Sequence, residues 1–297
     1  MKKIIAFAAF LFAACGLYAQ DAASVAMPYS IVPRTVKSLS TGGTAAFDDA
    51  TLRVFGDNKF DSEISWYSWA PSGVGTTDIN ADLFARIGQK LGVTAQFALD
   101  NGQKYDIYDA TGMKGGSFTP KDMMFKLGVS YRILPSLSAG ATFRYMSSSL
   151  AAKNTYPAFA ADVMAAYEFG SAHVAAGVTN LGTSVIAADG ASFSLPAAAT
   201  LAGDYALSFA EKHAVDFKLQ ADWFFKGGLC ARAGAEYGFN DMAFVRLGYC
   251  YGGASPMPSF LSLGIGGKFA GVCINAAYLL GSPTVGGTLA IGAGYSF

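Results

Sequence analysis

The chain has 297 residues, of which 52% are hydrophobic and 14% charged, and its formal net charge is zero. This balance gives no sign of a nucleic-acid partner. Beyond residues 1–19, no apolar and uncharged stretch reaches the roughly 18 residues of a transmembrane helix, so helical membrane spans are excluded. The two histidines and four cysteines form no Cys-x-x-Cys or His-x-x-x-His motif, and we expect neither a metal site nor a cofactor.

The N-terminus has the pattern of an export signal. A basic start precedes an apolar run over residues 4–14, which is too short to span a bilayer, and Ala19 provides the small residue that a signal peptidase requires. We expect a signal peptide over residues 1–19 and a mature chain that begins at Gln20. Cys15 weakly resembles a lipoprotein acylation site, which leaves lipidation as the less favoured alternative.

Residues 20–61 do not alternate well and are predicted to form a plug or hatch. The strands that follow are numerous enough to enclose a lumen, which needs either water or a plug. Gly42 and Gly43 would permit tight turns within that plug. Together with these glycines, Asp48 and Asp49 are the residues that we expect to matter for the function of the plug. The alternative is a disordered periplasmic leader.

Residues 62–297 contain fourteen segments of about ten residues in which apolar side chains recur at every second position, the period of a β-strand. An even number of strands is what a closed antiparallel bacterial barrel requires. The sequence therefore predicts an all-β transmembrane barrel of fourteen antiparallel strands in the outer membrane. The segments are 62–70, 78–87, 90–100, 122–132, 136–146, 157–169, 172–181, 194–206, 212–225, 228–238, 242–252, 259–269, 271–281 and 287–297.

The positions of the charges test the register of these strands. A one-residue slip would move them into hydrocarbon, at a cost of about 2–4 kcal/mol for each Lys or Arg at mid-depth. The charged residues alternate with the apolar ones along each strand, so they point to the opposite face of the wall and should line the lumen. The predicted lumenal residues are Asp82, Arg86, Lys126, Arg132, Arg144, Asp162, Asp216, Lys218, Glu236 and Arg246. Their mixed signs favour pairing around a plug, and a charge-selective lining is the alternative.

Connection lengths predict the orientation, because outer-membrane barrels have short periplasmic turns and longer outer loops. Alternate connections are short, and the barrel should begin and end on the periplasmic side. The predicted outer connections are 71–77, 101–121, 147–156, 182–193, 252–258 and 282–286, with a short exception at 226–227. The loop 101–121 carries Tyr105, Tyr108 and Phe118, which we expect either to contact a partner or to fold over the barrel mouth.

The last segment is the predicted closing strand. Its apolar face ends in Tyr295 and Phe297, an aromatic pair suited to the membrane interface. Further back, Cys230 and Cys250 would lie opposite each other in one register of their hairpin and could form a disulfide. A shift of two residues would instead pair Glu236 with Arg246, and we favour that ion pair.

Nothing in the sequence indicates an enzyme. His173 has the lumenal parity and His213 the lipid-facing parity, so they cannot share one site. No Gly-x-Ser-x-Gly nucleophile motif is present.

Five short stretches together resemble the PorV/PorQ family of outer-membrane proteins. They are residues 42–50, 180–182, 195–205 (Leu195-Pro196 with Gly203 and Tyr205), 234–237 and 246–249. The resemblance implies a FadL-like barrel associated with the type IX secretion system, which docks or shuttles exported cargo proteins together with other secretion components. The alternative function is a FadL-like channel through which a hydrophobic small molecule diffuses across the outer membrane. A purely structural barrel, in contact with outer-membrane lipid alone, is the third possibility.

Overall fold

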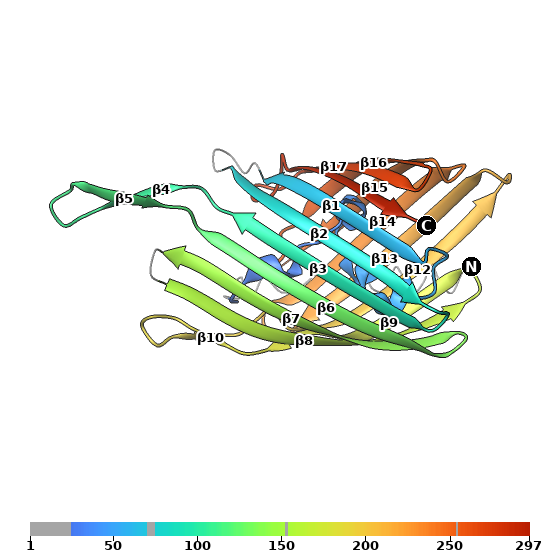
Figure 1. Ribbon diagram of the computed structural model, residues 1–297, viewed down its shortest axis with the longest axis horizontal. Coiled ribbons are helices and arrows are strands. Elements are labelled where there is room, and N and C mark those ends of the chain that lie inside the picture. Colours follow the sequence, from blue (N-terminus) through green and yellow to red (C-terminus); the bar gives the residue numbers. More distant parts are fainter. Residues whose placement is uncertain (1–24, 70–74, 152–153, 254) are drawn as a thin grey trace.

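A computed structural model describes residues 25–69, 75–151, 154–253 and 255–297. The strands close into a single antiparallel barrel (Figure 1). Its fourteen strands are β1 (Phe60–Trp69), β2 (Thr76–Ile87), β3 (Leu91–Asn101), β6 (Lys121–Leu134), β7 (Leu137–Ala151), β8 (Asn154–Phe169), β9 (Ala172–Gly182), β12 (Ala198–Phe209), β13 (His213–Phe224), β14 (Gly228–Phe239), β15 (Ala243–Tyr251), β16 (Phe260–Phe269), β17 (Val272–Leu280) and β18 (Leu289–Ser296). The predicted fold class is therefore confirmed. The predicted signal peptide and Cys15 lie outside the described residues.

The barrel closes where its first and last strands meet. β1 pairs with β18 from Asp61 opposite Ser296 to Ser68 opposite Leu289. Beyond that ladder, the backbone N–H of Phe297 donates to the carbonyl of Phe60. Closure gives every strand two neighbours, so no strand edge is left unpaired in the membrane.

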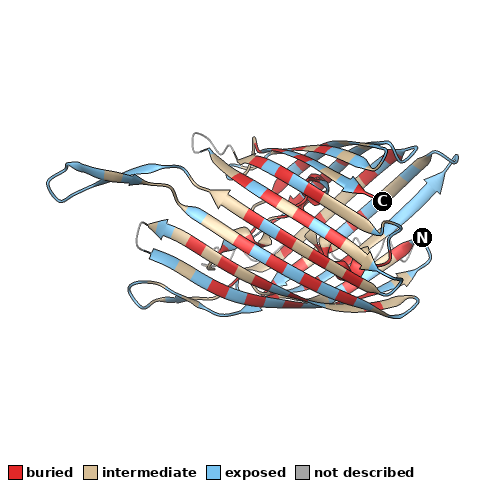
Figure 2. Cartoon of the chain, in the orientation of Figure 1, coloured by how far each residue is buried: buried red, intermediate tan, exposed pale blue. Residues whose placement is uncertain are grey.

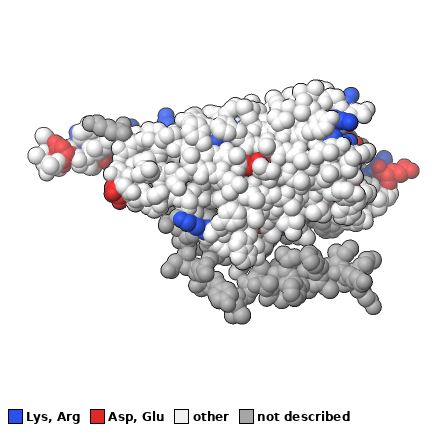
Figure 3. All heavy atoms as spheres, turned by 90° about the horizontal axis from the view of Figure 1, so that it is seen from below, with Lys and Arg blue, Asp and Glu red and all other residues white. Residues whose placement is uncertain are grey.

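Alternation along each strand separates the two faces of the wall. Figure 2 shows buried and exposed residues following one another along the strands. Outward side chains such as Ile64 and Ile265 are 67% and 64% exposed. On the flank in Figure 3, most charged side chains lie near the ends of the barrel, and the surface between them is largely uncharged apart from an acidic group near its middle. This surface has the composition that lipid contact requires. Among the described residues, no helix is long and apolar enough to cross a membrane.

The two ends of the barrel differ. One end, called the turn end below, carries the short connections 88–90, 135–136, 170–171, 210–212, 240–242 and 270–271. The opposite end is called the loop end. The turn end corresponds to the side that the sequence predicts to face the periplasm.

The prediction of an outer loop over residues 147–156 is wrong. β7 and β8 continue past the apolar region as a hairpin, with Ser147 opposite Pro157 and Ser149 opposite Thr155. The side-chain oxygens of Ser149 and Thr155 lie 2.9 Å apart. These small polar residues lack the apolar alternation of a membrane strand, yet they extend the ladder beyond the membrane, where no hydrophobic face is needed.

The predicted outer loops 101–121 and 182–193 contain structure of their own. Strands β4 (Tyr105–Tyr108) and β5 (Lys114–Phe118) form a separate two-stranded hairpin, and β10 (Val185–Ile186) pairs with β11 (Ser192–Phe193). The β4–β5 hairpin extends away from the barrel (Figure 1). It therefore does not fold over the barrel mouth, which was one of the two predicted arrangements.

Candidate functional site

Residues 25–59 form a plug inside the barrel. Its helical elements are η1 (Pro28–Ile31), α2 (Val36–Ser40), η2 (Ala45–Asp48) and α3 (Ala50–Arg53). The Thr35 hydroxyl caps α2 by accepting from the Ser38 N–H, and the Asp49 carboxylate caps α3 by accepting from the Thr51 N–H. α2 packs against β15–β18, whereas α3 packs against β3 and β6–β9. These two groups of strands lie on different sides of the ring, so the plug spans the lumen.

The first contact of the plug with the wall is built from glycines. Gly42 has a φ of +77°, and a Cβ atom there would lie 2.6 Å from the Ala233 carbonyl oxygen. A Cβ atom on Gly234 would lie 2.4 Å from the Thr41 carbonyl oxygen, and one on Gly248 would lie 1.9 Å from the Gly42 nitrogen. The plug backbone therefore rests directly on the backbone of β14 and β15. We call this contact the glycine seat.

Hydrogen bonds fix the plug in the glycine seat. The Gly42 N–H donates to the Ser262 hydroxyl oxygen at 2.9 Å. The same hydroxyl donates to the Ser40 carbonyl oxygen at 3.0 Å. Both bonds are buried, and a buried backbone group that loses its partner is costly.

The second contact holds α3 through wall hydroxyls. Ser130 on β6 donates to the Ala50 carbonyl oxygen at 2.8 Å, and Ser138 on β7 donates to the Thr51 carbonyl oxygen. Arg132 donates to the Val54 carbonyl oxygen at 3.1 Å. The Ala50 carbonyl group also accepts from the Val54 N–H, whereas carbonyl groups nearer the end of so short a helix lack intrahelical partners.

Ion pairs join the plug to the wall as well. Arg53 lies 2.7 Å from an Asp82 carboxylate oxygen, and its guanidinium group lies over the Phe84 ring at 4.8 Å. Nearer the loop end, Arg34 is buried and lies 2.9 Å from Asp100. Lys37 contacts Glu236 at 3.4 Å. Neither Arg34 nor Arg53 carries a periodic signal in the sequence, and sequence reasoning missed both.

Most predicted lumenal residues are buried and paired on the wall. Arg144 donates to Asp162 at 2.9 Å, Arg246 pairs with Glu236, and Lys218 lies 3.2 Å from Asp216. Within the predicted set, Asp82, Lys126, Arg144, Asp162, Lys218, Glu236 and Arg246 are buried, while Arg86, Arg132 and Asp216 are half-buried. Arg86 donates to the carbonyl groups of Gly56 and Asp57 in the plug. In this arrangement most of the predicted lumenal side chains contact one another or the plug.

Asp48 of the plug is electrostatically unusual. Its pKa is raised from the ordinary 3.8 to about 6. Burial is the main cause and the nearby Asp82 carboxylate the second, while Arg53 opposes both. The hydroxyl groups of Thr35 and Ser38 donate to it at 3.0 and 2.7 Å. Protonation of Asp48 therefore favours the closed plug.

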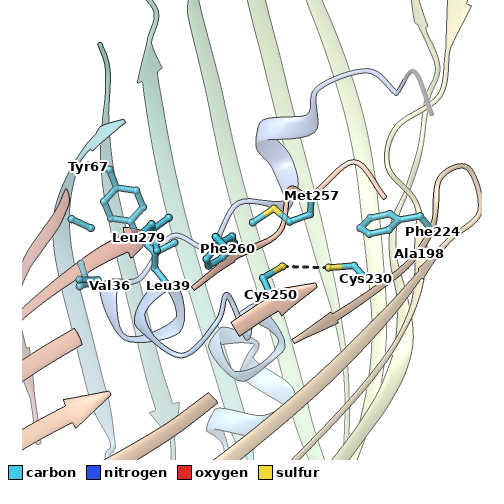
Figure 4. Close-up of a cluster of buried hydrophobic side chains, with 12 residues drawn as sticks. Val36, Leu39, Tyr67, Ala198, Phe224, Cys230, Cys250, Met257, Phe260 and Leu279 are labelled. Carbon is cyan, nitrogen blue, oxygen red and sulfur yellow. Dashed lines mark hydrogen bonds between the residues drawn. The ribbon is translucent and has the colours of Figure 1, made fainter. Parts of the chain in front are cut away.

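The loop-end half of the lumen contains an apolar region beside a charged cluster in which Arg34 lies close to Asp78 and Asp100. The lumen nearer the turn end is lined by the paired charges described above, which we call the polar belt. Inward side chains near the loop ends of the strands form two clusters with residues of the plug, and Figure 4 shows the first of them. The first contains Val36, Leu39, Tyr67, Ala198, Phe224, Cys230, Cys250, Met257, Phe260, Ala277, Leu279 and Ala290. The second contains Met27, Ala98, Met124, Met146, Ala158, Ala160 and Leu195. We call these clusters together the apolar layer.

The space left between plug and wall is small. A cavity of about 70 Å³ lies at the boundary between the apolar layer and the polar belt, where Met124, Phe224 and Lys126 line it. Ligand pockets are commonly about 300–1,000 Å³. This cavity is therefore too small for a solute of ordinary size.

The predicted partner-binding residues lie at the tip of the molecule. Tyr105 and Tyr108 on β4 are 41% and 61% exposed, and Met113 is 68% exposed. Phe118 on β5 is half-buried against Tyr105, with ring centroids 5.8 Å apart. Tyr295 and Phe297 are exposed on the outside of the barrel at the turn end.

The structure places the two histidines and fixes the register of the hairpin that carries Cys230 and Cys250. His173 faces inward, where its ring stacks on Phe55 of the plug and its Nδ1 lies 3.0 Å from Asp204. His213 contacts the Tyr237 hydroxyl on the outer face. Glu236 lies opposite Arg246, so the favoured register is the observed one. Within the described part of the chain, no cluster of His, Cys, Asp and Glu could hold a metal ion.

The resemblance to known proteins is structural. No protein family model matches the chain, and no curated protein is significantly similar to it in sequence. The Pseudomonas putida toluene transporter TodX superposes with a TM-score of 0.60 at 13% identity, over 93% of this chain and 99% of that one. The Ralstonia pickettii toluene transporter TbuX gives 0.58 at 11% identity, over 90% and 99%.

A third solved structure, titled "CymD monoaromatic hydrocarbon channel", gives a TM-score of 0.60 at 11% identity, over 90% of this chain and 97% of that one. Identities this low show the fold alone. The PorV/PorQ resemblance is not shown by these comparisons. The chain has the fold of the FadL-like fourteen-stranded barrels of the bacterial outer membrane.

Proposed function

We propose that the chain is an outer-membrane channel for a small hydrophobic molecule, the alternative function considered from the sequence. The observation that carries this proposal is the apolar layer. Inward residues such as Met146, Phe260 and Leu279 are almost completely buried at the loop end. The lumen of a water-filled porin is polar, so an apolar lining suits a hydrophobic solute better than ions or sugars.

The energetics of the apolar layer support this proposal. Transfer of apolar surface out of water is worth about 25 cal/mol for each Å². A hydrophobic solute that replaced the start of the plug would regain contacts with Met124, Met146 and Leu195. A charged or strongly polar solute would lose hydration against these apolar side chains, which offer it no partners. The names of the similar structures, two toluene transporters and a monoaromatic hydrocarbon channel, support the same class of solute.

The plug would act as the gate. Residues 25–33 contribute to the apolar layer through Met27, which packs there with Met124 and Met146. The glycine seat and the bonds to α3 hold the remainder of the plug below. We expect the solute to displace residues 25–33 first, while the seated part moves only to complete passage.

Uptake of radiolabelled toluene tests this function. The full chain is exported to the outer membrane of cells that lack other hydrophobic channels, and initial uptake rates are compared with those of cells without the chain. We expect faster toluene uptake and unchanged uptake of a hydrophilic sugar. Equal toluene rates with and without the chain would refute the proposal, as would a faster uptake of the sugar.

A substitution in the apolar layer makes the test specific. Met146 is fully buried and faces inward. We expect Met146→Gln to reduce toluene uptake about tenfold, because an unpartnered buried amide costs about 1–3 kcal/mol. Met146→Leu preserves the apolar lining and serves as the matched control, with uptake near that of the wild type. Equal uptake by both variants would show that the layer does not determine passage.

Protein docking in type IX secretion is the second candidate function. It is favoured by the β4–β5 hairpin, whose exposed Tyr108 and Met113 project beyond the barrel. Deletion of residues 103–119 leaves the barrel strands intact and tests the idea by affinity purification from outer membranes. Loss of secretion components or cargo from the purified material upon deletion would support docking, and an unchanged set of copurifying proteins would refute it.

A further inference from the structure

Cys230 and Cys250 lie next to each other in the apolar layer (Figure 4). Their sulfur atoms are 3.6 Å apart, and both side chains are completely buried. Both are free thiols in the structure. Neither the proposed channel nor the docking function uses them.

The strand ladder allows the two sulfur atoms to approach further. Cys250 pairs with Arg232, and the ladder between β14 and β15 ends at the pair Ala231 and Tyr251. Cys230 lies just beyond that last pair, so no backbone hydrogen bond fixes it to β15. A disulfide requires a sulfur–sulfur distance of about 2.05 Å, which is roughly 1.5 Å shorter than the present separation. Side-chain rotations must supply most of this change, because Cys230 pairs with Asp222 on β13 and that ladder continues to Gly228.

The surroundings favour a disulfide over metal binding. Neither thiol belongs to a cluster of three or more potential metal ligands among the residues the structure describes. Cys273 provides a contrast within the same chain, because it is half-buried on β17 and its sulfur contacts the Ser296 hydroxyl instead of a second thiol.

We propose that Cys230 and Cys250 form a disulfide when the chain crosses the periplasm. One thiolate attacks the disulfide of an oxidising thiol–disulfide exchange protein and forms a mixed disulfide, which the second thiolate then resolves. The pair loses two electrons and two protons, and the oxidant is reduced to its dithiol. Because both side chains are completely buried in the barrel, the reaction precedes closure of the wall.

The disulfide would lock the wall that carries the glycine seat. The hairpin of β14 and β15 is closed at the turn end by residues 240–242 and would be closed at the loop end by the new bond. Ala233 and Tyr249, whose backbone atoms contact Gly42, lie between these two closures. The bond would therefore hold both strands at the spacing that the seat requires.

Peptide mapping of the exported full chain tests the proposal. Free thiols are blocked with N-ethylmaleimide during extraction from the outer membrane, the protein is denatured in excess reagent, and its peptides are analysed without reductant. We expect one cross-linked peptide pair containing Cys230 and Cys250, two hydrogen atoms lighter than the separate peptides, and a labelled Cys273. Labelling of Cys230 and Cys250 in most of the unreduced protein would overturn the proposal.

A second measurement tests whether the disulfide stabilises the barrel. We expect a reductant to lower the temperature at which the wild-type barrel unfolds in a gel mobility assay, and to have no effect on Cys230→Ser. Cys273→Ser is the matched control and should respond as the wild type does. An equal response of Cys230→Ser and the wild type would contradict the lock, and the peptide map decides the disulfide even if this variant fails to fold.

Discussion

The glycine seat yields the sharpest prediction, the effect of Gly248→Ala. Gly248 lies on β15 opposite Gly234 on β14 and Ser262 on β16. The new Cβ atom would lie 1.9 Å from the Gly42 nitrogen and 2.3 Å from the Thr41 carbonyl carbon. Both atoms belong to the plug backbone, so no flexible side chain can move aside. The plug must lift from the wall.

The magnitude follows from the bonds that lifting would break. The Ser262 hydroxyl joins the Gly42 N–H and the Ser40 carbonyl group through two hydrogen bonds of 2.9 and 3.0 Å. Each contributes about 1 kcal/mol net, so the closed plug should lose about 2 kcal/mol. Since about 1.4 kcal/mol corresponds to a factor of ten, the released state of the plug should become about 30 times more populated.

Thiol labelling measures that population. Ser40→Cys in a Cys273→Ser background places a fully buried thiol under the seat, and a membrane-impermeant maleimide labels it only when the plug opens. We expect Gly248→Ala to accelerate labelling about 30-fold. The matched control is Gly267→Ala on β16, where the nearest atom to the new Cβ would be 3.8 Å away. Equal labelling rates in Gly248→Ala and this control would refute the seat.

Three further predictions concern the plug and the wall. Arg53→Ala leaves the buried Asp82 carboxylate without its ion pair, so we expect a plug weakened by about 3–5 kcal/mol in the same labelling assay. Because the pKa of Asp48 is raised from 3.8 to about 6 in the closed plug, plug stability should fall as pH rises from about 4 to 6 and then level off; Asp48→Asn should remove this dependence of labelling on pH. Gly182→Ala would place a Cβ atom 2.1 Å from the Phe159 carbonyl oxygen, so the barrel should unfold at a lower temperature in a gel mobility assay.

The sequence predicted the wall well because lipid imposes one simple rule on it. Every second residue of a membrane strand meets hydrocarbon, so a charge such as Lys218 or Arg246 can only point inward. The same rule fixed the register of β14 and β15, in which Glu236 lies opposite Arg246. Where the strands leave the membrane, as at Ser147, the rule ends and the predicted loop was wrong.

The contacts between the plug and the wall were harder to predict, because the residues that make them follow no periodic pattern in the sequence. Ser130, Ser138 and Ser262 are inward and small, and only the folded structure shows that they bind plug carbonyl and amide groups. Arg34 and Arg53 lie in a segment without alternation. Their partners are distant in the sequence.

The apolar layer did leave a signal in the sequence. Near the loop end, apolar residues occupy both faces of a strand, as in Trp223-Phe224-Phe225 on and just after β13. Phe224 is 2% exposed and faces the lumen, while Trp223 is 60% exposed and faces outward. A run of consecutive large apolar residues at a strand end therefore indicates an apolar lumen at that depth.

The division of the lumen into two layers suggests which part of the plug yields first. In the described plug, the ion pairs to the wall involve Arg34, Lys37 and Arg53 and none of residues 25–33. Residues 25–33 instead contact the wall through packing in the apolar layer and through hydrogen bonds of Ala26, Tyr29 and Ser30. Dispersion and hydrophobic contacts are not directional, so a hydrophobic solute can replace that packing, whereas it cannot replace an ion pair or a hydrogen bond. A hydrophobic solute entering from the loop end would therefore compete with the part of the plug that it is best able to displace.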